Sequence, residues 1–144
     1  MSTFIQAAKS FKYGDGNDIY VGPVVVSEEY IFLTCKKVMS ADKALKRKAG
    51  IVGHALSIFT EKEADPFEYA VPIPDEILND SNWPVDKSIT SAIIIQKKEA
   101  EKIKYPFWGS LCVTVNNIDF NILADFFSRK KILNIFRQNN WNIK

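Results

Sequence analysis

The amino-acid sequence predicts an α+β protein, in which an antiparallel sheet is followed by one C-terminal helix. β-branched and aromatic residues concentrate in the ranges 19–26, 30–38 and 91–96, as is typical of strands. Two later runs alternate apolar and polar residues with the two-residue period of a strand, and residues 129–140 change to the period of an amphipathic helix. We therefore expect six or seven antiparallel strands, partly closed, with this helix over one end.

The two alternating runs predict a hairpin. Leu111, Val113 and Val115 alternate with polar or small residues, and the alternation resumes as Ile118, Phe120 and Ile122. Asn116-Asn117 separates the runs, and asparagine tolerates the positive φ angles that a two-residue turn requires. A tight turn is therefore expected at this pair.

The terminal helix is expected to begin after Ser128, whose side chain is suited to cap it. One side of the helix carries apolar residues: Ile132, Leu133, Ile135 and Phe136. The other carries Lys130, Lys131, Asn134, Arg137 and Gln138. A helix with one apolar stripe needs a surface to cover that stripe, so we expect it to pack against the sheet.

Two of the earlier strands have irregular features. Gly22-Pro23 interrupts the range 19–26, which predicts either a kinked edge strand or two short strands, since proline cannot donate to a ladder. The range 30–38 is apolar on both faces until Lys36 and Lys37. Its outer face therefore needs a cover.

Residues 41–90 are interpreted as an insertion between strands. Residues 41–63 contain no proline and predict a helix, which is the expected cover of that outer face. Four prolines between residues 64 and 90 exclude long regular elements, although a short helix fits at 74–78, where Pro74 suits the first helical position. Trp83 is expected to anchor this segment to the rest of the protein.

Length and composition predict a single domain, residues 1–144, in the cytoplasm. The chain is 47% apolar, which suffices for one packed core, and its net charge of +2 gives no broad basic field for nucleic acid. Cys35 and Cys112 stand apart and are expected to be reduced and buried. We find no signal peptide, and the longest apolar run, 49–59, is shorter than the roughly 20 residues that span a bilayer.

The sequence shows no pattern that predicts catalysis, a metal site or a cofactor. His54 is the one histidine, and no metal-ligand spacing surrounds it. A dyad of Cys35 with His54 is conceivable, but nothing in the sequence fixes its geometry. The acidic turn at 14–18 lacks the other ligands of a calcium loop. Tyr105, Phe107 and Trp108 beside Lys102 and Lys104 could stack nucleobases, but strand alternation favours a core role for them.

Two candidate surfaces lie on the predicted 41–63 helix. Ala49, Gly53 and Ser57 are four residues apart and form a smooth strip flanked by Leu56 and Phe59, which fits close docking of a protein partner or of a second copy. The basic start of the same helix fits anionic lipid headgroups as the alternative. The residues of this lipid site are Lys43, Lys46, Arg47 and Lys48.

The order of elements over residues 19–38 and 91–141 resembles the bacterial pleckstrin-homology-like and GRAM-like domains. The resemblance implies a strongly bent antiparallel sheet, a PH-like partial barrel, plugged at one end by the C-terminal helix. The helical and Pro-rich insertion at 41–90 departs from the simplest version, and the basic lipid-binding loop of the family is not matched residue by residue. We therefore expect a non-catalytic interaction module that binds through the 41–63 helix, with peripheral membrane binding as the alternative.

Overall fold

The computed structural model describes residues 4–13, 18–41, 59–63, 70–104, 110–123 and 129–143. Its helices are α2 (Asp75–Leu78), the 3-10 helix η3 (Lys97–Glu99) and α3 (Arg129–Gln138). Within these ranges, ten strands form one sheet. They are β1 (Ile5–Tyr13), β2 (Ile19–Val26), β3 (Tyr30–Thr34), β4 (Lys37–Ala41), β5 (Phe59–Glu63), β6 (Val71–Pro72), β7 (Ser91–Gln96), β8 (Lys102–Lys104), β9 (Ser110–Val115) and β10 (Ile118–Leu123).

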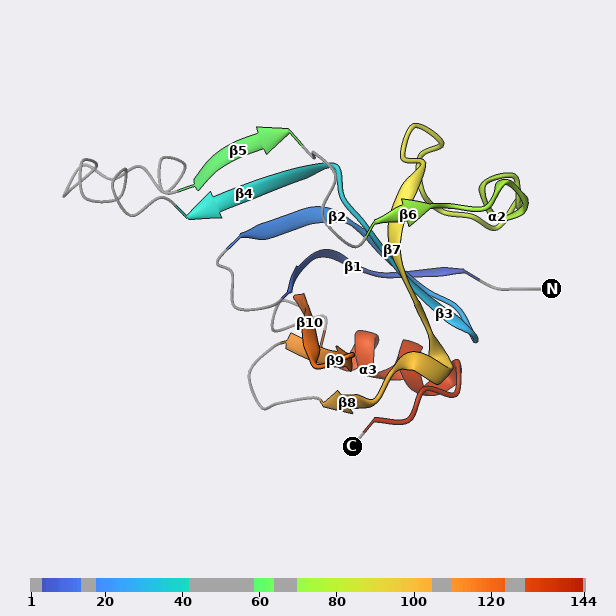
Figure 1. Ribbon diagram of the computed structural model, residues 1–144. Helices are drawn as coiled ribbons and strands as arrows, with labels where there is room; N and C mark the ends of the chain where they lie inside the picture. The colour runs from blue at the N-terminus through green and yellow to red at the C-terminus, as the bar shows by residue number, and fades with distance from the viewer. Residues whose placement is uncertain are drawn as a thin grey trace.

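All strand pairs are antiparallel, and the sheet is strongly curved (Figure 1). The main path runs β6-β7-β3-β2-β1-β10-β9-β8, and within the described ranges its two ends do not pair with each other. The expected α+β class is confirmed, but six or seven strands was too few. Apolar and polar residues alternate only weakly over the range 5–13. This range becomes strand β1 because β2 and β10 pair with its two edges.

β2 lies inside the sheet, and its second edge is shared by two partners. Val24, Val25 and Val26 pair with β3, whereas residues 19–21 pair with β4. Gly22-Pro23 lies at the change of partner, so the missing N–H of Pro23 leaves no ladder position unfilled. A Cβ on Gly22 would overlap the backbone oxygen of Thr34, which explains the glycine. Neither predicted alternative, an edge strand or two short strands, is correct.

The predicted strand 30–38 is divided by a corner at Cys35 and Lys36. The backbone N–H of Lys36 donates to the oxygen of Val21 over 2.7 Å, and the Thr34 hydroxyl donates to the oxygen of Pro23 over 2.6 Å. These bonds fix the corner opposite Gly22-Pro23. The chain therefore leaves β3 and joins the other half of β2 as β4.

The prediction of a helix over residues 41–63 is wrong at both ends of that range. Ala41 ends β4 and Phe59 begins β5, and the two strands pair from Ala41↔Phe59 to Lys37↔Glu63. Residues 42–58 lie outside the described part. The free edge of β4 supplies hydrogen-bond partners to residues 59–63, and this non-local pairing overrides their helical interpretation.

The terminal helix packs on one face of the sheet, here called the inner face (Figure 1). Ile132, Ile135 and Phe136 are buried there, while Leu133 is half-buried. The predicted polar side is exposed at Lys130, Lys131, Asn134, Arg137 and Gln138. The amphipathic interpretation is confirmed, because the stripe meets apolar residues of the sheet such as Leu111 and Val113.

The hairpin turn at Asn116-Asn117 is also confirmed. Val115 pairs with Ile118 across it, and the two asparagines have φ angles of 52° and 65°. Positive φ at both central residues defines the turn type whose twist matches that of the strands.

No helix in the described ranges is both long enough and apolar enough to cross a membrane.

Candidate functional site

The candidate site lies on the other face of the sheet, the outer face, over β3 and β7. Strand alternation directs Ile31, Leu33, Ile93 and Ile95 to the inner core, so the intervening residues point outward. The register pairs Phe32 with Ile94, and Tyr30 with Gln96. These two cross-strand pairs form the floor of the site.

A second hydrophobic cluster covers part of this outer face. Ile73, Trp83 and Val85 are buried against Phe32 and Phe4. The Trp83 ring meets the Phe4 ring edge to face at 5.3 Å and the Phe32 ring at 5.0 Å. The prediction that β3 is buried on both faces is confirmed, as is Trp83 as an anchor. The cover in the described chain is the segment 70–90, however, and not the 41–63 helix.

Hydrogen bonds within the covering segment fix its shape. The N–H of Ile73 donates to the oxygen of Thr90 over 2.8 Å, which closes the segment at its base. Asp80 and Asp86 each accept a backbone N–H two residues later, from Asn82 and Ser88. Such aspartate-centred turns replace regular structure where prolines exclude it. The short helix expected at 74–78 is present as α2, with Pro74 preceding its first residue.

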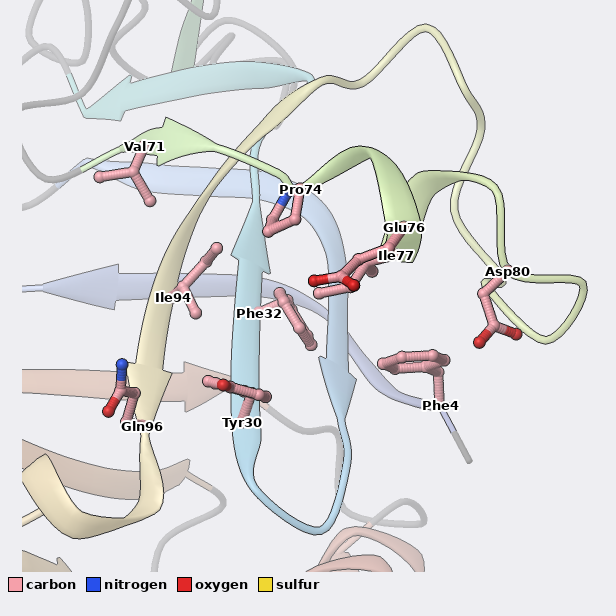
Figure 2. A pocket seen from close by; sticks show the side chains of 10 residues that line it. All are labelled: Phe4, Tyr30, Phe32, Val71, Pro74, Glu76, Ile77, Asp80, Ile94 and Gln96. Atoms are coloured by element: carbon pink, nitrogen blue, oxygen red, sulfur yellow. The ribbon is translucent and has the colours of Figure 1, made fainter. Parts of the chain in front are cut away.

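Between the covering segment and the strands lies a groove of about 550 Å³ (Figure 2). Its floor comes from β3 and β7, and its walls come from β6, α2 and the N-terminal Phe4. The lining residues are Phe4, Tyr30, Phe32, Val71, Pro74, Glu76, Ile77, Asp80, Ile94 and Gln96. Most of these lining residues are apolar, and three are aromatic, whereas polar atoms contribute about as much of the groove's surface as apolar atoms do.

The two carboxylates among the described lining residues lie on the α2 side of the groove. Glu76 is exposed within α2, and Asp80 is half-buried just after it. In Figure 2 the Glu76 side chain extends from α2 toward the strands, and Asp80 lies on the side of Phe4. None of the described lining residues is Lys, Arg or His. An apolar floor with acidic groups at its rim suits a ligand that combines an apolar surface with a positive charge.

In the described chain, no residue of the two surfaces predicted on the 41–63 helix lines this groove. Ala49, Gly53, Leu56 and Ser57 lie outside the described ranges, as do the four basic residues Lys43, Lys46, Arg47 and Lys48. Phe59 is the first residue of β5 rather than part of a helix. Of the basic and aromatic run at 102–108, Lys102 and Lys104 are exposed on β8, and residues 105–108 are not described.

The Cys35 thiol is in an environment unlike that of a nucleophile. It is half-buried and donates to the backbone oxygen of Lys37 over 3.3 Å. Burial raises the pKa of Cys35 to about 11. A reactive thiolate needs a lowered pKa, so the shift opposes the proposed dyad, whose other member, His54, lies outside the described chain. Burial likewise raises the pKa of Cys112.

Sequence reasoning missed the groove, although one of its signals was visible. The range 30–38 is apolar on both faces, which predicts a cover over its outer face, and Tyr30 and Phe32 lie on that face in the structure. The sequence pattern does not show that the covering segment is shorter than the outer face of β3 and β7 beneath it. Trp83 reaches Phe32, while Tyr30, Ile94 and Gln96 line the open part.

Comparison with protein-family models, with curated proteins and with solved structures gives no match to this chain.

Proposed function

We propose that this protein is a non-catalytic interaction module of pleckstrin-homology-like type, and that the outer-face groove binds a segment of a protein partner. The observation that carries the proposal is the groove beside α2, most of whose described lining residues are apolar. Its volume of about 550 Å³ lies within the range of about 300–1,000 Å³ that is usual for binding pockets.

The exposed apolar residues of the groove support a binding role. Val71 lies at the groove with 45% of its surface exposed, and it is the one large apolar side chain that is exposed in the described chain. Ile77 and Ile94 are half-buried beside it. When a partner covers apolar surface in a groove, that surface is removed from water, and this stabilises the complex.

The pleckstrin-homology-like assignment is supported by a curved antiparallel sheet whose inner face receives one terminal helix. With the inner face filled by α3, the outer face remains for recognition. Binding through the 41–63 helix and membrane binding through Lys43, Lys46, Arg47 and Lys48 stay predictions on residues outside the described ranges.

Selection of peptides from a random displayed library on the immobilised protein tests the proposal. Ile77 and Leu78 are neighbours in α2, both half-buried against the second cluster, but Ile77 lines the groove and Leu78 does not. Peptides that bind the groove should lose about tenfold in affinity with Ile77→Ser, since one apolar contact is removed. They should keep their affinity for Leu78→Ser.

Two results would contradict the proposal. One is a selection that yields no peptide with reproducible affinity for the wild-type protein. The other is a set of peptides that bind the two serine variants equally well. Circular dichroism and thermal melting of both variants establish that each is folded before binding is compared.

A further inference from the structure

We infer that the groove selects a partner segment in which a Lys or Arg side chain stands beside an apolar one, with the cation at Glu76 and Asp80. This inference rests on the proposed function and names the chemistry of its partner. The charges of the groove and its apolar and aromatic surface support it.

The charged groups among the described lining residues are of one sign. Glu76 and Asp80 are both acidic, whereas the whole chain carries a net charge of +2. Neither carboxylate forms an ion pair with another described residue. Asp80 accepts one hydrogen bond at Oδ1, from the N–H of Asn82 over 2.8 Å. The groove therefore offers carboxylate oxygens to a cation from outside.

The apolar part of the groove fits the rest of such a side chain. Lys and Arg place an aliphatic stem on apolar surface while their charged end reaches a polar group. Ile77 and Ile94 provide apolar surface, and the half-exposed ring of Tyr30 is a surface to which a cation is attracted. One long cationic side chain thus uses both the floor and the rim.

Other partner chemistries fit less well. A phosphorylated or acidic segment would bring like charge against Glu76 and Asp80, which is unfavourable. A wholly apolar segment would remove water from the carboxylates without replacing its hydrogen bonds. Charge complementarity therefore favours a basic and apolar segment over both.

The test uses the peptides recovered in the selection described above. Each peptide is synthesised with its Lys or Arg and again with citrulline in place of Arg or norleucine in place of Lys, which keep the aliphatic stem of the side chain but not its charge. We expect the charged form to bind wild-type protein about fivefold more tightly, an advantage of the size typical for exposed ion pairs and cation–π contacts. The difference should shrink as salt is raised from 20 mM to 500 mM, because salt screens exposed charges.

Three protein variants test which carboxylates of the protein attract the cation of the peptide. Glu76→Gln and Asp80→Asn should each abolish most of the preference for the charged peptide. The amide oxygen of Asn can still accept from Asn82, so the turn is kept in Asp80→Asn. Asp75→Asn is the matched control, because Asp75 is an exposed carboxylate in the same helix that does not line the groove. It should leave the preference unchanged.

The outcomes separate the inference from the proposed function. The inference is overturned if the peptides whose binding depends on Ile77 lack Lys and Arg. It is also overturned if the charged and the uncharged forms of these peptides bind equally well. In both cases the groove remains a binding site. Equal effects of Asp75→Asn and Glu76→Gln also overturn it. Failure to recover any peptide that depends on Ile77 overturns both.

Discussion

The indole N–H of Trp141 donates a hydrogen bond of 2.8 Å to the backbone oxygen of Ser27, which is 114 residues earlier in the chain. Trp141 follows α3, and Ser27 begins the turn between β2 and β3. Asn140 has a φ angle of 64°, and the N–H of Trp141 donates to the oxygen of Phe136 over 2.9 Å. This is the hydrogen bond of a Schellman helix end. The helix end thus positions the indole that joins α3 to the sheet.

This hydrogen bond predicts that Trp141 and Trp83 respond differently to the same substitution. Both indoles are buried, but Nε1 of Trp83 has no hydrogen-bond partner in the described chain. Trp141→Phe leaves the Ser27 oxygen unpaired, so it should lower the free energy of unfolding by about 1–3 kcal/mol more than Trp83→Phe does. Urea unfolding of the two variants measures this. Equal losses would show that the bond to Ser27 contributes nothing to stability.

The inward stripe of α3 predicts the effect of a buried charge. Phe136 is fully buried in the apolar inner core, so Phe136→Asp places a carboxylate among apolar side chains, and the protein should be unfolded or insoluble. Asn134→Asp, on the exposed side of the same helix, should change stability by less than about 0.5 kcal/mol. Thermal melting followed by circular dichroism compares them. A Phe136→Asp melt within a few degrees of the wild type is the contrary result.

The hairpin turn predicts opposite effects of Gly and Ala at one position. Asn117 has a φ angle of 65°, which glycine adopts freely and alanine does not. Asn117→Gly should keep or slightly raise the melting temperature, whereas Asn117→Ala should cost about 1 kcal/mol. Differential scanning calorimetry of both variants decides it. Equal stability of the Ala and Gly variants would be inconsistent with this turn.

The raised pKa of Cys35 predicts slow thiol chemistry at neutral pH. Folding keeps the thiol protonated up to a pKa of about 11, above the ordinary value of 9.0. In a Cys112→Ser variant, reaction of Cys35 with a disulfide reagent should therefore be slow at pH 8 and should accelerate as pH rises toward 11. Unfolding in urea should remove the protection. A folded protein that reacts at pH 8 as fast as the unfolded chain would exclude the shift.

The parts of this protein that the sequence determines are those that depend on short-range pattern. The alternation around Asn116-Asn117 predicts the hairpin, and the spacing of Ile132, Ile135 and Phe136 predicts the buried side of α3. The need for a cover over β3 follows from the apolar residues on both of its faces. Each of these depends on side chains a few residues apart, which share a face whatever the rest of the chain does.

Tertiary structure alone decides which strands become neighbours. The same sequence pattern allows Gly22-Pro23 to end a strand or to lie inside one, and the outcome depends on β3 and β4 sharing one edge of β2. Residues 59–63 are strand because the edge of β4 receives their hydrogen bonds. The groove exists because the segment 70–90 covers Phe32 but leaves the floor at Tyr30 and Gln96 open. Pairing and coverage join residues distant in sequence, so no local period encodes them.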